Sequence, residues 1–294
     1  MFYEVAALGA ALCWTFAAFI AGDLSKQIGG ITFNRLRNVG VFFVLLIFVS
    51  FAGLWETFRV ADLGIILISG FIGIAIGDSF LFCAMQRIGP RRSELLYACN
   101  APISVILGIY ILGESLNFIE VIGIIIISLG VLAAIKWGKP KSSNVHRWEI
   151  TEGNIMIGIG FGLIAALGQS IGSIIIKPVL DNGANPMLVS MMRVGVSALF
   201  LTIMFYVRNV EPVQTITNKH RALATLNGIL AIGIGVSLLL YAYSVGGIGI
   251  ASILSSTQAV MMLPIIWLKT KQRPTLGAWI GAILVVVGLG LMYY

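Results

Sequence analysis

The feature that most constrains this chain is a stretch that it contains twice. Residues 70–130 recur at a constant offset of 158 positions, so that residues 70–77 align without a gap with residues 228–235 and Gly123 falls on Gly281. The earlier part of each half matches more loosely, at offsets of 151 and 155. Glycines mark places where another backbone approaches closely, so glycines paired in one unbroken register indicate a repeated structural unit. We infer that one unit was duplicated and fused.

The composition places this duplicated unit in a membrane. Hydrophobic residues make up 59% of the chain and charged residues only 11%, whereas a soluble protein carries roughly 25% charged residues. The net charge of +7 does not indicate nucleic-acid binding, because the basic residues lie between apolar runs and would face the cytosol and lipid headgroups. The cysteines, Cys13, Cys83 and Cys99, lie inside apolar runs without a CxxC spacing. The two histidines lie in connecting segments, so we expect no metal site.

Ten apolar runs are long enough to cross a bilayer, which takes about 20 residues per helix. The sequence therefore predicts an all-α, polytopic membrane protein with a first five-helix repeat over 1–136, a linker over 137–152 and a second five-helix repeat over 153–294. The first run lacks a basic leader and carries Glu4, so it is not predicted to be a signal peptide. The predicted helices span 3–22, 34–55, 62–85, 92–112, 117–136, 153–177, 185–207, 220–244, 249–268 and 275–294.

An odd number of helices per unit predicts that the second unit is inserted upside down relative to the first. The first unit's four connections hold three, one, three and no Lys or Arg residues, and those of the second hold one, three, none and three. With the linker included, 16 basic residues fall on one side and 2 on the other. Cytoplasmic loops collect Lys and Arg. The sequence thus predicts inverted repeats in the cell membrane, with both termini on the non-cytoplasmic side.

Several motifs resemble those of one known transporter family. Trp14 stands between small residues in the first run, and Asn100-Ala-Pro102 is followed by Gly113-Glu114 and later by Gly123. Together these residues resemble the EamA family of the drug/metabolite transporter superfamily, and the resemblance covers nearly the whole chain as two EamA units. In the second unit the pattern decays, since Gln272 replaces Glu114.

The resemblance implies a secondary transporter that moves small organic metabolites or drug-like compounds, often as an exporter, and that carries no bound cofactor. Inverted repeats favour a substrate site near the bilayer midplane where the halves meet, reached alternately from each side. The expected partners are a small-molecule substrate, the lipid bilayer and a coupling proton. A non-transporting membrane receptor or scaffold, or an intramembrane enzyme, are the alternatives. A scaffold would lack a polar cavity, and an enzyme would need a converging nucleophile, base and metal or phosphate ligands.

Three ionisable residues lie within the predicted helices. A charge at the bilayer centre costs about 2.5–3.5 kcal/mol on the insertion scale, so such residues face a watery cavity or a partner. Our hypothesis is that Asp78 and Arg193 bind substrate, and that Asp78 or Glu94 carries the coupling proton. The alternative is structural pairing with a neighbour. For Glu94 the nearby Arg91 and Arg92 favour that alternative.

Uncharged polar and aromatic residues complete the candidate site. Asn100 and Gln258 occupy the same position in the two repeats, at the offset of 158, and amides at both positions fit either a shared cavity or hydrogen bonds between helices. Glu114 sits at a helix–helix corner, where we favour a capping role. The weaker substrate-binding candidates are Trp14, Tyr97, Gln169 and Tyr241, and the residues predicted to be structural are Glu114, Pro102, Gly123 and Gly281.

One enzyme-like pattern occurs inside an apolar run. Residues 168–172 read Gly-Gln-Ser-Ile-Gly, which satisfies the G-x-S-x-G pattern of serine hydrolases. That pattern needs a strand–turn–helix setting and a histidine partner. Neither is expected here, so we interpret the small residues as a helix-packing surface, and we predict that the protein is not an enzyme.

Overall fold

The computed structural model describes residues 2–100, 102–104, 106–107, 117–137, 151–207, 214–246, 254–255, 257–271 and 273–292. All regular structure in these ranges is helical, and six helical spans are long and apolar enough to cross a membrane, with shorter apolar helices beside them. The chain is therefore an all-α, polytopic membrane protein. Glu114 and residues 138–150, most of the predicted linker, lie outside the described residues, as do parts of the predicted helices over 92–112 and 249–268.

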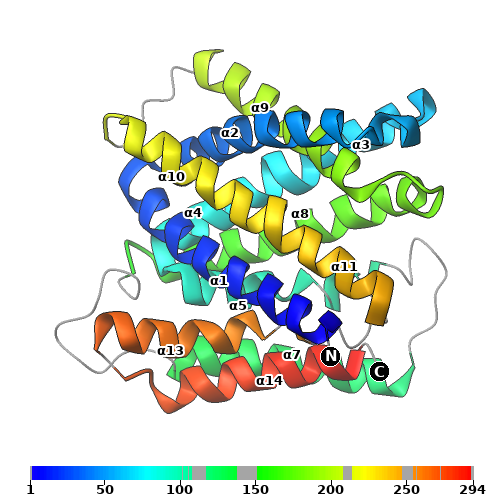
Figure 1. Cartoon of the computed structure of the whole chain (residues 1–294). Helices are drawn as coiled ribbons and strands as arrows, with labels where there is room; N and C mark the ends of the chain where they lie inside the picture. Colours follow the sequence, from blue (N-terminus) through cyan, green and yellow to red (C-terminus); the bar gives the residue numbers. More distant parts are fainter. Residues whose placement is uncertain are drawn as a thin grey trace.

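Figure 1 shows the order of the helices along the chain. Two 3₁₀ turns, η1 and η2, connect α2 to α3. The bounds in the first half are α1 Phe2–Ile28, α2 Gly30–Phe51, η1 Leu54–Thr57, η2 Val60–Asp62, α3 Leu63–Gly70, η3 Phe71–Asp78, α4 Ser79–Ile88, α5 Pro90–Tyr97 and α7 Phe118–Trp137, and those in the second half are α8 Ile155–Asp181, α9 Pro186–Val207, α10 Asn218–Gly228, η4 Ile229–Val236, α11 Ser237–Gly246, α13 Gln258–Thr270 and α14 Leu276–Met292.

A single glycine separates α1 from α2 and α4 from α5, so the connections there are shorter than the sequence predicts. Gly29 has a φ of 87° and Gly89 a φ of 82°, a backbone region that suits glycine and lets one residue reverse the chain. Because α2 already begins at Gly30, Arg37 is a buried helix residue and not a loop residue. Arg91 and Arg92 are likewise buried in α5. Three of the 16 basic residues assigned to one side are therefore inside the bundle.

Both halves contain a π-helical segment at the same place. The π-helices η3, Phe71–Asp78, and η4, Ile229–Val236, are each 8 residues long and are related by the offset of 158. In each half the next residue, Ser79 or Ser237, donates a hydrogen bond to the carbonyl four positions earlier. A π-helix widens the turn and often marks a functional site. The sequence repeat thus extends to an irregular backbone feature.

A second irregularity is also shared by the two halves. After α5 the chain makes a turn in which the Cys99 amide donates to the Leu96 carbonyl at 3.0 Å. At the offset of 158, the Thr257 amide donates to the Leu254 carbonyl at 3.2 Å just before α13. The helices are therefore interrupted at matching positions, next to Asn100 and Gln258.

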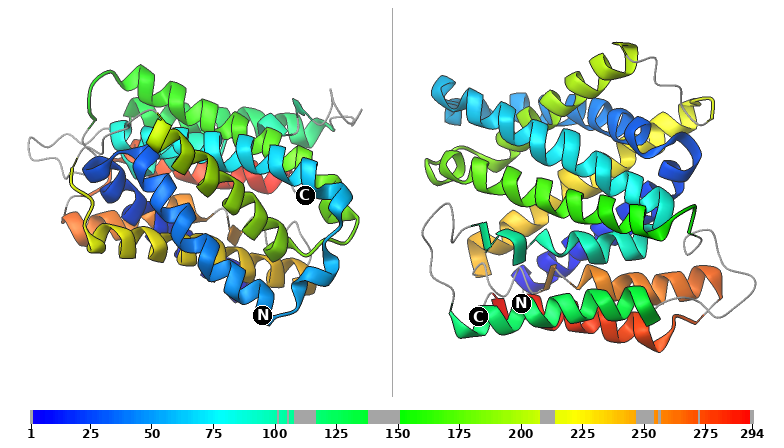
Figure 2. Two further views of the ribbon diagram at one scale, coloured as in Figure 1. Left: turned by 90° about the horizontal axis from the view of Figure 1, so that it is seen from above. Right: turned by 180° about the vertical axis from the view of Figure 1, so that it is seen from behind.

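The helices run along a common direction, with α7 and α14 together at one edge in two views (Figures 1 and 2). These two helices correspond to each other at the offset of 158, and they pack in opposite directions. Gly130 lies against Gly281, and Gly288 lies against Gly123, so the contact partner falls as the residue number rises. This places Gly123 and Gly281 in the packing role expected for them, where the absence of a side chain lets the backbones meet.

Several other close crossings pair helices from different halves. α8 crosses η3 and α4, while α1 crosses η4 and α11. The α8–η3 crossing has glycines on both sides, because a Cβ on Gly172 would lie 2.9 Å from the Gly73 Cα and a Cβ on Gly168 would lie 3.1 Å from the Gly77 Cα. These are the glycines of the G-x-S-x-G pattern. They serve helix packing, and the pattern lies within the continuous helix α8.

Candidate functional site

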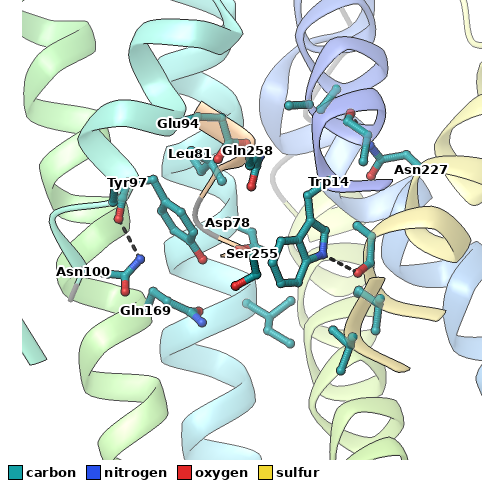
Figure 3. Close-up of a pocket in the computed structure, with 18 of the residues that line it drawn as sticks. Trp14, Asp78, Leu81, Glu94, Tyr97, Asn100, Gln169, Asn227, Ser255 and Gln258 are labelled. Carbon is teal, nitrogen blue, oxygen red and sulfur yellow. Dashed lines mark hydrogen bonds between the residues drawn. The ribbon is translucent and has the colours of Figure 1, made fainter. Parts of the chain in front are cut away.

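A cavity of about 540 Å³ lies between the two halves, within the size range of small-molecule sites. Its walls combine charged, amide and aromatic side chains with aliphatic ones, and they draw on both halves of the chain. The polar and aromatic residues that line it are Trp14, Arg37, Asp78, Phe82, Glu94, Tyr97, Asn100, Gln169, Ser190, Arg193, Asn227, Ser255 and Gln258. Figure 3 shows how ten of the lining residues face the cavity.

An ion pair forms one part of the wall. Arg37 Nη1 on α2 donates to Asp78 Oδ2, at the end of η3, at 2.9 Å. The two side chains are only 8% and 11% exposed. Buried charges need such a partner, because removal from water is costly for each ion alone. The partner of this carboxylate is thus an arginine that was counted among the basic residues of a connection.

Arg193 on α9 is a second arginine of the cavity. Helices α2 and α9 are both 22 residues long. The sequence offset of 155 places Arg37 on Met192, one residue before Arg193, so the two arginines lie at nearly the same position of these helices. Both arginines attract the Asp78 carboxylate electrostatically. The cavity therefore holds one arginine from each half but only one acid at this position of the repeat, because Val236 stands where the second half would have the counterpart of Asp78.

Glu94 on α5 lines the same cavity, as does Gln258 from the other half, and the two side chains lie near each other (Figure 3). The sequence analysis favoured pairing of Glu94 with Arg91 and Arg92. Instead, Arg92 Nη1 donates to the Ile88 carbonyl at 3.1 Å, and the Glu94 side chain lines the cavity on a different face of α5.

Two side chains, the Asn100 amide and the Ser170 hydroxyl, form hydrogen bonds where the helix is interrupted after α5, beside the cavity. Asn100 Nδ2 donates to the Tyr97 carbonyl at 2.7 Å, and Ser170 Oγ on α8 donates to the Asn100 carbonyl at 2.8 Å. Asn100 therefore stabilises the interruption after α5 while also lining the cavity (Figure 3).

Trp14 faces η4 across the crossing of α1. Its indole Nε1 donates to the Ala231 carbonyl at 2.8 Å (Figure 3). Gln169 on α8 lies near Gly73 of η3, and Gly73 and Ala231 are equivalent at the offset of 158. The two halves thus present different side chains, an indole and an amide, at corresponding crossings, which makes the cavity wall asymmetric.

The cavity brings together most of the residues that the sequence analysis proposed as substrate contacts. Tyr241 is an exception: it is 49% exposed and is not among the lining residues. Leu239 on the same helix does line the cavity, and two residues further on an α-helix turns by about 200°, so Tyr241 faces away. We correct that assignment. The proposed residues that line the cavity are Trp14, Asp78, Glu94, Tyr97, Asn100, Gln169, Arg193 and Gln258.

Four polar residues that line the cavity were not singled out from the sequence. Arg37 looked like part of a basic loop, while Asn227, Ser190 and Ser255 are single polar residues in apolar runs. Asn227 Nδ2 donates to the Ala17 carbonyl at 2.6 Å. Isolated amides and hydroxyls in apolar helices are a usable signal for such positions, although most of them serve helix packing.

Comparison with known proteins agrees with this architecture. The chain matches the EamA-like transporter family over residues 1–135 and again over residues 156–294. It belongs to this family, as two EamA units within the drug/metabolite transporter superfamily. Pro102, a residue of the family-like motif, is buried beside the cavity-lining Asn100.

Solved structures share the fold at low sequence identity. One crystal structure of a protein aligns with 98% of this chain and 95% of its own, with a TM-score of 0.68 and 14% identical residues. At this identity the likeness concerns the fold alone. Among curated protein sequences, none matches the chain.

Proposed function

We propose that the protein is a secondary transporter of the cell membrane that exports small organic metabolites or drug-like compounds by alternating access, without a bound cofactor. The observation that carries this proposal is the cavity between the halves, which gathers two acids, two arginines and several amides inside an otherwise apolar bundle. Ionisable residues at membrane depth mark substrate or ion pathways. A scaffold protein is expected to lack such a polar cavity.

The proposal includes an inverted relation between the repeats. The antiparallel packing of the corresponding helices α7 and α14 supports it, as do the π-helices and helix breaks at matching positions. In transporters built from inverted repeats, discontinuous helices form the substrate site near the midplane, and rocking of the halves exposes it to each side in turn.

The proposal also couples transport to protons through Asp78 or Glu94. The charged and titratable side chains of the cavity are Arg37, Arg193 and Tyr97 together with these two acids. Asp78 is bound by Arg37, whereas Glu94 lies near the uncharged Gln258 on the cavity wall (Figure 3). An acid without a cationic partner loses less when it is neutralised, so we assign the proton to Glu94 first.

Transport by purified protein in proteoliposomes tests the function. The assay follows uptake of a metabolite and drug panel under an imposed pH gradient, with wild type, Asp78→Asn and Glu94→Gln compared. We expect uptake in wild type that follows the gradient. We also expect Glu94→Gln to exchange substrate across the membrane while responding to the gradient no more strongly than protein-free leak does.

Folding of each variant is checked by thermal unfolding in detergent. Arg59→Gln, at an exposed residue between α2 and α3, is the control outside the cavity. Gradient-driven uptake by Glu94→Gln and Asp78→Asn at the wild-type rate would remove both acids from the coupling role. Absence of uptake of every compound by folded wild type would favour a receptor or scaffold.

A further inference from the structure

Arg193 carries guanidinium nitrogens that no protein group satisfies. Among the described residues, its buried Nε and Nη2 have no hydrogen-bond partner. Arg37 has one such nitrogen, Nε, but its Nη1 is already bound by Asp78 at 2.9 Å. A buried N–H group without an acceptor is costly, and the cost is higher for a charged group. A ligand that brings an acceptor to Arg193 therefore removes the free-energy cost of these unsatisfied N–H groups.

Two glycines, Gly70 and Gly73, leave the space that Arg193 occupies. A Cβ on Gly70 would lie 2.7 Å from the Arg193 carbonyl oxygen, so α9 passes directly over η3 and the end of α3. A Cβ on Gly73 would lie 2.8 Å from Arg193 Nη2. The guanidinium thus occupies room that only a glycine leaves open, on the wall of the cavity. A side chain at Gly73 would displace it.

The remaining wall favours an apolar ligand body. Ile74, Val194, Leu239 and Val285 line the cavity together with the indole of Trp14. Asp78 offers less to a cation, because it is bound by Arg37 and attracted by Arg193.

We propose that the cavity binds small organic carboxylates, with the carboxylate on Arg193 and the apolar body against the aliphatic and aromatic wall. This inference rests on the proposed function and names its substrate class. A planar guanidinium binds a carboxylate through two parallel N–H···O hydrogen bonds. The Nε and Nη2 nitrogens lie on one edge of that plane, which is the edge such a fork uses. Both atoms are covered by protein, with Nη2 packed against Gly73, so the guanidinium has to turn from η3 toward the cavity to bind the carboxylate.

Matched probes that differ only in their polar group test the proposal. The purified full chain in detergent is titrated with benzoate, phenylacetate and indole-3-acetate, each beside its primary amide and the corresponding amine, while thermal unfolding is followed. We expect at least one carboxylate to raise the unfolding midpoint with saturation, and its amide and amine to leave the midpoint unchanged at equal concentration.

Variants then assign the effect to Arg193. We expect Arg193→Gln to weaken carboxylate binding by about tenfold to a hundredfold, the loss of charged hydrogen bonds. Arg193→Lys keeps the charge but not the fork, and should retain part of the affinity. Arg59→Gln should bind as wild type does. If no carboxylate shifts the midpoint, if the amide or amine shifts it equally, or if folded Arg193→Gln binds undiminished, the proposal is wrong.

The test separates this inference from the proposed function. Binding in detergent requires no transport, so a protein that binds carboxylates through Arg193 yet moves no compound across proteoliposomes keeps the inference and loses the function. A protein that transports only amines or neutral compounds keeps the function and loses the inference.

Discussion

At the level of single residues, the Arg37–Asp78 ion pair dominates the electrostatics of the cavity. Two side chains that are 8% and 11% exposed neutralise each other at 2.9 Å, and Arg193 lies within electrostatic reach of the same acid. Removal of one partner from a buried pair is more harmful than removal of both, because the remaining charge stays buried. The pair is therefore expected to show strong energetic coupling.

A double-mutant cycle tests this expectation. We predict that Arg37→Met and Asp78→Asn each lower the free energy of unfolding in detergent by about 3 kcal/mol. The double variant should lose less than the sum, with a coupling energy of about 1–3 kcal/mol. Strictly additive losses would mean that the two groups do not stabilise each other.

Some of the charged residues of the cavity can be recognised from the sequence, and others cannot. Asp78, Glu94 and Arg193 stand out because an isolated charge in an apolar run is costly. Arg37 does not stand out, since it falls near the start of the predicted helix over 34–55 with Lys26 and Arg35 nearby, which suggests the membrane surface. The single-residue turn at Gly29 starts the helix earlier and places Arg37 deeper in the bundle. Tyr241 faces away from the cavity, and the sequence does not show this. The π-helix η4 changes which residues of the following helix face the cavity, and a helix that is apolar on every face gives no pattern from which to read that change.

At the level of elements, glycine crossings set how closely the two halves approach. Gly73 and Gly77 of η3 meet Gly172 and Gly168 of α8, and Ser69 Oγ donates to the Gly172 carbonyl at 2.7 Å. In lipid the hydrophobic effect does not drive helices together, so their association depends on close packing and on hydrogen bonds such as this one. These contacts hold Asp78, at the end of η3, beside the cavity.

Two glycines of α8 give a matched comparison. A Cβ on Gly172 would meet backbone atoms of the partner helix at 2.9 and 3.1 Å, whereas a Cβ on Gly160 would meet nothing within 4 Å. We predict that Gly172→Ala destabilises the protein by about 1–3 kcal/mol. Gly160→Ala should be neutral or stabilise it by up to about 1 kcal/mol. Thermal unfolding of both variants checks this, and equal midpoints would contradict the tight crossing.

The presence of the helices could be predicted from the length of the apolar runs. The irregular segments within them, the π-helices and the helix breaks, could not. The predicted helix over 185–207 agrees with α9, Pro186–Val207, because charge and proline flank it. The π-helices and the breaks beside Asn100 and Gln258 leave no such signal, since they arise from how the halves pack. Their recurrence at the offset of 158 is visible only once the backbone is known.

At the level of the whole molecule, the orientation in the membrane remains a prediction from charge. Moving Arg37, Arg91 and Arg92 into the bundle lowers the count on the basic side but leaves a large excess there. We predict that both termini lie outside the cytoplasm. Fusions of alkaline phosphatase and of a fluorescent protein to the C-terminus report this: the phosphatase should be active and the fluorescent protein dark, and the reverse pattern would place the termini inside.

The claim on which the account depends is that the central cavity opens to each side of the membrane in turn. Ser190 lines this cavity on α9, and its change to cysteine is small. In a background with Cys13, Cys83 and Cys99 replaced by alanine, Ser190→Cys is exposed to a membrane-impermeant maleimide in vesicles of each orientation. The account predicts labelling from both sides, slowed by transported compounds. Labelling from one side only, in protein that transports, would contradict alternating access through this cavity.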